Sequence, residues 1–128
     1  TLLPRPKFGW NLNPGHFIAA DEWVSTPFVP GSDVKLQSGN YLQYDVIIAP
    51  DPPHFGANLE DGIVLADDEL RDSIRAKYPD TWARFERRRQ YVRDVLGINL
   101  GDEVLPMSDI LAYYRPFLLS RGNALAVR

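Results

Sequence analysis

The chain has 128 residues and a mass of 14.5 kDa, which corresponds to one ordinary domain or to one piece of a larger protein. Hydrophobic residues make up 45% and charged residues 24%, so the chain can build a core and does not resemble a disordered tail. The net charge of −3 disfavours nucleic-acid binding, and no apolar stretch has the roughly 20 residues of a membrane helix. The absence of cysteine excludes disulfides and thiolate metal sites, and with the absence of a signal-peptide pattern it favours a cytoplasmic protein.

Strands and loops are predicted for the first 66 residues, because eight of the eleven prolines lie there and proline disrupts helices. The clearest strand is predicted over 41–48, which is rich in aromatic and β-branched residues. A second strand is predicted over 57–65, interrupted by the polar residues 60–62, and it should pair antiparallel with the first. A weaker strand is predicted over 16–20, and a turn-rich connection over 27–36.

Helical spacing of apolar residues begins after residue 66. Asp67 or Asp68 is a suitable N-cap for a first helix. This helix should end before Pro79, because the residue that precedes a proline resists helical backbone angles. A second helix should then follow and stop at Gly97.

The second helix has an apolar stripe that contains Trp82 and Phe85. Most of its arginines fall on the opposite side, interleaved with acidic residues, which predicts a solvated face rather than a phosphate site. These arginines are Arg84, Arg87, Arg88, Arg89 and Arg93. A loop is predicted over 99–108, and a short helix or turn near 110–114.

The most informative feature of the sequence is a pair of acidic residues within apolar strands. Asp45 lies in a run suited to a buried strand, where a carboxylate needs a cation, hydrogen-bond donors or an exposed position. Glu60 is in the same situation on the adjacent predicted strand. If the two strands pair, both carboxylates can point at one site, and His16 would be the natural imidazole ligand. Oxygen ligands with an imidazole suit a hard or borderline divalent metal.

Several short motifs follow one another in a specific order. They are Gly15-His16-x-Ile18-x-x-Asp21-Glu22, Pro30-Gly31-Ser32, Ser38-Gly39-Asn40-Tyr41-Leu42-Gln43-Tyr44-Asp45 and Leu59-Glu60-Asp61-x-Ile63-Val64-Leu65. This succession resembles the creatinase/aminopeptidase P family, the "pita-bread" fold of Xaa-Pro aminopeptidases, prolidases, creatinases and methionine aminopeptidases. The resemblance covers about residues 12–67 and only the C-terminal half of the family's catalytic domain.

The resemblance implies an α+β fold, the C-terminal half of a pita-bread domain. Residues 1–66 would form its strand-rich half, with a curved antiparallel sheet from residue 12, and residues 67–128 a helical C-terminal extension packed on it. Half of a curved sheet leaves an unpaired edge and an uncovered apolar face. The expected partner is therefore the missing N-terminal half of the parent polypeptide, or further copies of the chain in a homo-oligomer.

In that family two aspartates, one histidine and two glutamates hold two metals, which activate a water that attacks the peptide bond. His16 matches the ligand histidine, Asp45 the first glutamate and Glu60 the second. The resemblance thus implies a divalent cation such as Mn, Zn or Co, although a chain without any cofactor is the alternative. No acidic residue precedes His16 to match the two aspartates, so this chain alone is expected to be inactive.

Two functions therefore remain open. The first is a Xaa-Pro aminopeptidase/dipeptidase-type metallopeptidase that acts on a peptide substrate and is present here as a fragment. The second is a non-catalytic binding or interaction module with the same fold. Two features speak for the second without deciding between them: Asp45 is shorter than the family's glutamate, and Trp23 aligns with the family's second histidine. Trp23, as a wall of the substrate pocket, and the loop residue His54 are the candidates for substrate contact.

Overall fold

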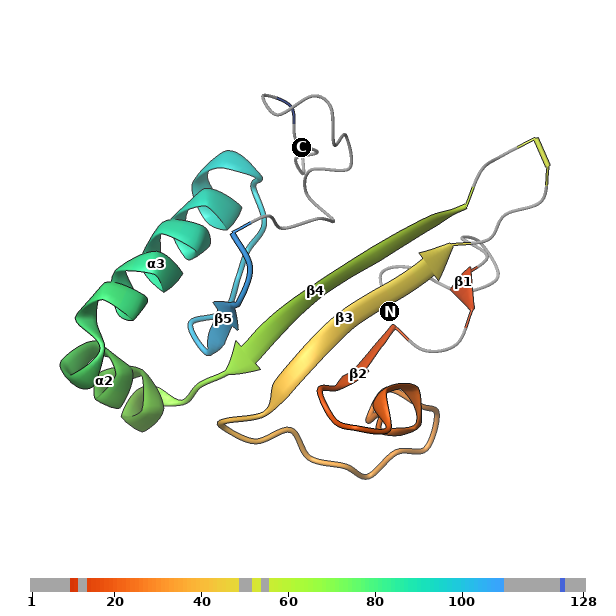
Figure 1. Cartoon of the computed structure of the whole chain (residues 1–128), viewed down its shortest axis with the longest axis horizontal. Coiled ribbons are helices and arrows are strands. Elements are labelled where there is room, and N and C mark those ends of the chain that lie inside the picture. Colours follow the sequence, from red (N-terminus) through yellow and green to blue (C-terminus); the bar gives the residue numbers. More distant parts are fainter. Residues whose placement is uncertain (1–9, 12–13, 49–51, 54–55, 110–122, 124–128) are drawn as a thin grey trace.

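The computed structural model describes residues 10–11, 14–48, 52–53, 56–109 and 123 (Figure 1). Its strands are β1 (Trp10–Asn11), β2 (Gly15–Phe17), β3 (Tyr41–Ile48), β4 (Ala57–Leu65) and β5 (Val104–Pro106). Its helices are the short η1 (Glu22–Val24), α2 (Asp68–Lys77), α3 (Pro79–Gln90) and the π-helical turn η2 (Tyr91–Val95). The combination of one antiparallel sheet with helices confirms the α+β prediction.

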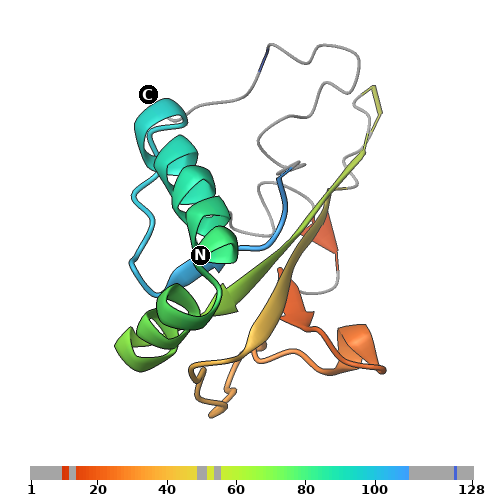
Figure 2. The same ribbon diagram turned by 60° about the vertical axis from the view of Figure 1, so that its left-hand side comes forward.

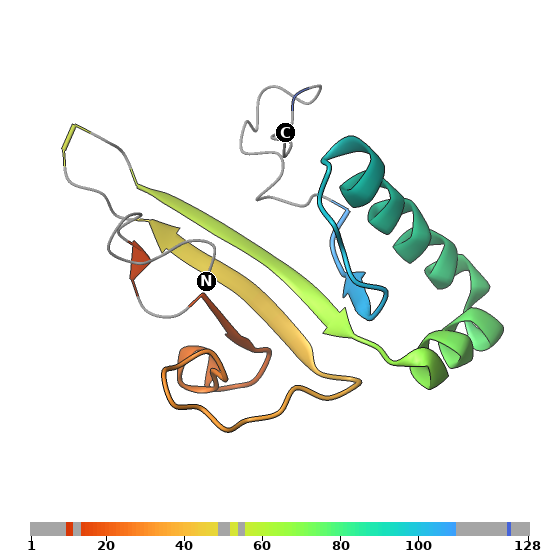
Figure 3. The same ribbon diagram turned by 180° about the vertical axis from the view of Figure 1, so that it is seen from behind.

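The sheet is built around the long hairpin of β3 and β4, which pair along their whole length from Tyr41↔Val64 to Ile48↔Ala57 (Figures 1 and 3). β5 pairs with the C-terminal end of β4, while β1 and β2 both pair with the opposite edge of β3. Every pairing is antiparallel. The short strand β2 therefore lies beside the N-terminal half of β3, and β3 and β4 separate it from β5.

The predicted bounds of the two long strands are confirmed by β3 and β4. The predicted interruption of the second strand is wrong, because Glu60 and Asp61 continue the register opposite Asp45 and Tyr44. The weaker strand is shorter than expected and starts one residue earlier, at Gly15. The loop predicted over 99–108 contains β5, whose three residues are too few to show a period in the sequence.

The two predicted helices and the break between them are confirmed. Asp67 caps α2 through its side chain, which accepts a hydrogen bond of 2.9 Å from the backbone N–H of Leu70. Pro79 begins α3 at a position where its missing N–H costs nothing. The second helix was expected to run unbroken to Gly97, but after Gln90 it widens into η2, where the Leu96 N–H donates to the Tyr91 carbonyl at 3.1 Å.

The main core lies between α2, α3 and the paired ends of β4 and β5. Ala66, Phe85 and Leu105 are buried there, and partly buried apolar residues surround them, among them Val64 and Ile74. A smaller cluster forms where η2 meets the following loop, around Val92, Leu96, Tyr91, Ile98 and Leu100. Figure 2 shows both helices on the β5 side of the sheet, whereas β2 and η1 lie on the β3 side.

The predicted solvated face of the second helix holds for Arg84 and Arg87 of α3 and for Arg93 of η2, which are exposed, but it is wrong for Arg89. Arg89 is 4% exposed, and its Nη2 donates to Asp102 at 2.6 Å and its Nη1 to Glu86 at 3.4 Å. Helical spacing groups Arg89 with the other arginines. The sequence does not indicate that the loop after η2 brings Asp102 back to the helix, where it pairs with Arg89.

The neighbouring Arg88 links α3 to the end of β5 through hydrogen bonds. It donates to the Pro106 carbonyl at 2.9 Å and to the Asp109 carboxylate at 2.7 Å. None of the helices in the described part of the chain has the length and apolar character needed to cross a membrane. The predicted short helix near 110–114 lies outside the described residues.

Candidate functional site

Gly15 allows β2 to approach β3 closely, and this approach positions the next residue, His16. A Cβ atom on Gly15 would lie 2.4 Å from the carbonyl oxygen of Gln43, a distance that no side chain tolerates. The backbone φ of +156° also favours glycine. Glycine at this position therefore lets the backbone place the following imidazole against the sheet.

His16 is almost completely buried, with 1% of its surface exposed. Its Nδ1 lies 2.8 Å from the carbonyl oxygen of Phe17. Because a carbonyl only accepts hydrogen bonds, Nδ1 must carry the proton. In the neutral imidazole, Nε2 is then the nitrogen with a free lone pair, which is the state that a metal ligand requires.

Asp45 faces that nitrogen from the middle of β3. Its Oδ2 is 3.9 Å from Nε2 of His16, too far for a hydrogen bond, and the two form an ion pair only when the imidazole is protonated. Asp45 is 4% exposed, and its Oδ1 has no hydrogen-bond partner in the described part of the chain. A buried carboxylate with one oxygen opposite an imidazole nitrogen and the other oxygen without a partner is an arrangement that a cation would stabilise.

Glu60 lies directly across the β3–β4 pairing from Asp45, as the sequence predicted. Its side chain is exposed, however, and its Oε2 accepts a hydrogen bond of 3.0 Å from Nε2 of Gln43. Within residues 10–11, 14–48, 52–53, 56–109 and 123, no three acidic or histidine side chains are close enough to hold a metal together. The sheet therefore brings His16 and Asp45 into one site and leaves Glu60 beside it.

The next residue, Asp61, was not identified as a candidate from the sequence. It is 8% exposed, its Oδ1 accepts from the Gly62 N–H at 2.8 Å, and its Oδ2 has no partner in the described residues. Burial raises the pKa of this carboxyl, and the Gly62 hydrogen bond and the positive charge of Arg88 oppose that rise. Strand alternation places Asp61 on the same face as the apolar Ile63, a pattern that could have indicated its burial.

The two proposed substrate-contacting residues are not tested by the structure. Trp23 lies in η1, but its side chain is outside what the structure describes. His54 lies outside the described residues altogether. The substrate side of the site is therefore without an assigned residue.

The donor set at β2 and β3 fits one divalent cation in part. The tautomer of His16 leaves Nε2 available, and Asp45 offers an unpartnered oxygen of the opposite charge to a cation. Two ligands alone hold a metal weakly, and a third oxygen from Glu60 requires its side chain to leave Gln43.

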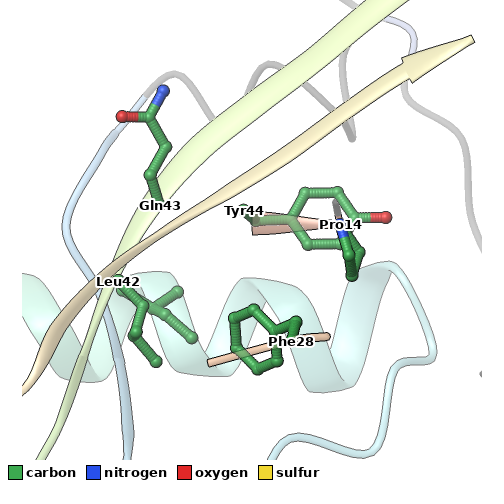
Figure 4. Close-up of a pocket in the computed structure, with 6 residues that line it drawn as sticks. Pro14, Phe28, Leu42, Gln43 and Tyr44 are labelled. Carbon is green, nitrogen blue, oxygen red and sulfur yellow. The ribbon is translucent and has the colours of Figure 1, made fainter. Parts of the chain in front are cut away.

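The opposite face of the hairpin carries a different feature, an apolar pocket of about 220 Å³. It is lined by Pro14, Phe28, Leu42, Gln43, Tyr44 and Ile63. Figure 4 shows the Leu42, Phe28, Tyr44 and Pro14 side chains gathered on one side of β3, with Gln43 directed to the other. Phe28 closes the pocket from the β2–β3 connection and remains 39% exposed.

A scan against protein-family models, a search of the curated proteins and a search of the solved structures each found no match to this chain. What the site can do is therefore inferred from its own residues, which are a buried imidazole, a buried carboxylate and an exposed carboxylate at neighbouring positions of one sheet.

Proposed function

We propose that this chain is the metal-binding half of a pita-bread metallopeptidase of the Xaa-Pro aminopeptidase/dipeptidase type. The observation that carries the proposal is the buried His16–Asp45 pair, whose carboxylate keeps one oxygen without a partner. A purely structural histidine and aspartate would be expected to hydrogen-bond each other. At 3.9 Å they do not, and a divalent cation between them would engage both groups.

Each residue has a distinct task in this proposal. Phe17 holds the proton on Nδ1 of His16, so that Nε2 is free to bind the metal. Asp45 supplies negative charge in a site from which the sheet excludes water, and Glu60 supplies a further carboxylate from the paired strand. When bound, a divalent cation such as Mn, Zn or Co would act as a Lewis acid and lower the pKa of a water molecule.

The proposal also requires a partner, because the resemblance implies two aspartate ligands upstream of His16. We propose that the missing N-terminal half of the parent polypeptide supplies them. On this proposal that half approaches the face of the sheet that carries His16 and Asp45, opposite the apolar pocket.

Metal titration of the 128-residue chain tests the proposal directly. Isothermal titration with Mn²⁺, Zn²⁺ and Co²⁺ should give one weak site that is lost in His16→Ala and in Asp45→Ala. An Asp33→Ala variant, which removes an exposed carboxylate outside the sheet, should bind as the wild type does. Binding that survives both site substitutions, or no binding at millimolar metal, would show that the pair is not a metal site.

The peptidase assignment needs a second measurement. Native mass spectrometry of the protein, purified without denaturation, should show a companion polypeptide with one or two divalent metals. That assembly should cleave Xaa-Pro peptides and lose activity with a chelator, whereas the 128-residue chain alone should be inactive. A fully metal-loaded assembly that cleaves no such peptide would rule out the enzyme and leave a metal-binding protein.

The apolar pocket favours a second candidate, a non-catalytic interaction module. This pocket lies on the face opposite His16 and is closed by the partly exposed Phe28, as a site for an apolar side chain of a partner would be. If this candidate is correct, Phe28→Ser should abolish association with the companion polypeptide while His16→Ala and metal removal leave it intact. Association that depends on metal and not on Phe28 would favour the enzyme.

A further inference from the structure

We propose that Gln43 is a positioning residue that holds the Glu60 carboxylate away from the His16–Asp45 pair. This inference rests on the proposed function and names the residue that regulates its third ligand. Glu60 would join the metal only by exchanging its hydrogen bond to Gln43 for the cation. Gln43 would thus set how tightly the isolated site binds metal.

The strand register places Gln43 between the groups concerned. It lies opposite His16 on β2 and opposite Gly62 on β4, and it is two residues from Asp45 on β3. Residues two apart on a strand share a face, so Gln43 and Asp45 project from the same side of the sheet. Glu60, directly opposite Asp45, projects from that side as well.

Glu60 therefore has two neighbours that can receive its carboxylate. Directly opposite residues of an antiparallel pair have Cβ atoms about 4.5–5.5 Å apart, so the flexible Glu60 arm can reach the Asp45 site. In the structure its Oε2 instead accepts from Nε2 of Gln43 at 3.0 Å. Gly62, opposite Gln43, has no side chain to compete for that space, and the Tyr41 ring lies over it.

The size of the effect follows from the cost of one hydrogen bond at an exposed site. A typical hydrogen bond contributes about 0.5–1.5 kcal/mol net, which corresponds to roughly a two- to twelvefold change in an equilibrium constant. Gln43→Leu removes the amide and leaves a branched apolar side chain that is one atom shorter. We expect this variant to bind metal about three- to tenfold more tightly than the wild type, because Glu60 is released.

The experiment is a Co²⁺ titration of the 128-residue chain, followed by calorimetry and by the visible absorption of the bound ion. Gln43→Leu should bind more tightly and change the Co²⁺ spectrum as a third ligand joins. The double variant Gln43→Leu/Glu60→Gln should lose both the gain and the spectral change. Gln90→Leu, at an exposed position on α3, is the matched control and should leave affinity unchanged.

A metal-free readout separates this inference from the proposed function. The side-chain amide signals of Gln43 in a ¹H–¹⁵N NMR spectrum should shift in Glu60→Gln without any metal. If Gln43→Leu binds Co²⁺ no more tightly, or if its gain survives Glu60→Gln, the inference is wrong while the metal site stands. If neither the wild type nor Gln43→Leu binds Co²⁺, both are wrong, and a shifted Gln43 amide then marks only a structural contact.

Discussion

The Nε2 atom of His16 and the Oδ2 atom of Asp45 face each other at 3.9 Å in a buried part of the sheet. The separation is longer than a hydrogen bond, and both side chains are withdrawn from water. Each has a restraint that fixes it there, since Nδ1 of His16 donates to Phe17 and the Asp45 N–H donates to the Pro14 carbonyl at 3.2 Å. Asp45 thus has one oxygen opposite the imidazole and a second, Oδ1, without a hydrogen-bond partner in the described residues.

Asp45→Asn should raise the free energy of unfolding in metal-free buffer by about 1 kcal/mol, because it removes an unpartnered buried charge. It should also abolish the rise in melting temperature that divalent metal gives the wild type. Urea unfolding and thermal scans with and without Mn²⁺ measure both effects. Asp33→Asn, at an exposed position, is the control and should show neither.

The opposite result has a clear meaning. If Asp45→Asn is less stable than the wild type without metal, the carboxylate has a hydrogen-bond partner in solution and does not need a cation to stabilise it.

Gly15→Ala should destabilise the fold by about 2 kcal/mol, because the new Cβ would displace β2 from the Gln43 backbone. The displacement should also separate His16 from Asp45, so metal binding should weaken together with stability. Gly31→Ala is the matched control, since Gly31 has a φ of +80° but no atom within 4 Å of the new Cβ. That variant should cost about 1 kcal/mol from backbone strain alone and leave metal binding intact.

Equal losses in the two glycine variants would indicate that backbone conformation, and not the close approach of β2 to β3, accounts for Gly15.

The elements that could be predicted from the sequence are those with a local physical signature. β3 is rich in aromatic and β-branched residues, and α2 has an N-cap at Asp67 and a proline just beyond its end. β5 could not be predicted in this way, because its three residues form a strand only through their pairing with β4. The widening of α3 into η2 after Gln90 likewise has no local marker.

The candidate site was predictable to the same limited extent. The cross-strand position of Asp45 and Glu60 follows from pairing two recognisable strands, and the structure has that register. The direction of the Glu60 side chain could not be predicted, because it depends on a hydrogen bond from Gln43 on the other strand, and no sequence pattern indicates that bond. The burial of Asp61, by contrast, could have been inferred, because strand alternation places it on the same face as the apolar Ile63.

Asp61 should make stability depend on pH. Burial raises its pKa above the ordinary value of 3.8, so the folded state favours the protonated carboxyl. Its contribution is therefore fully present below the unfolded-state pKa and is lost as the pH rises through the folded-state pKa. Asp61→Asn cannot ionise, so its stability relative to the wild type should increase as the pH rises from below 3.8 towards neutrality.

Urea unfolding of both proteins across that pH range measures the difference. A constant difference at all pH values would mean that Asp61 has the same proton affinity in the folded and unfolded states.

Asp67 should produce the opposite pH dependence. The hydrogen bond from the Leu70 N–H is the main reason that its pKa is lowered, and Ser38 adds to the effect. A lowered folded-state pKa gives stability that is present above the unfolded-state pKa and lost as the pH falls through the folded-state pKa. Asp67→Ser keeps a capping oxygen without a charge, so its free energy of unfolding should fall less at acid pH than that of the wild type. Asp67→Ala should in addition lower the helix content of α2 at neutral pH.

Replacing the buried Arg89 should reduce the free energy of unfolding less than removing one of its acidic partners. Its guanidinium donates to Asp102 and Glu86, while its Nε has no partner in the described residues. Arg89→Met should keep the packing of the side-chain stem and remain within about 1 kcal/mol of the wild type. Asp102→Ala should destabilise more than Arg89→Met, because it leaves a buried cation with only the longer contact to Glu86.

In the double variant Arg89→Met/Asp102→Ala the penalty of the second substitution should largely disappear, and urea unfolding of the four proteins measures this coupling. Additive losses in that cycle would mean that Arg89 contributes through its packing on α3 and not through its charge.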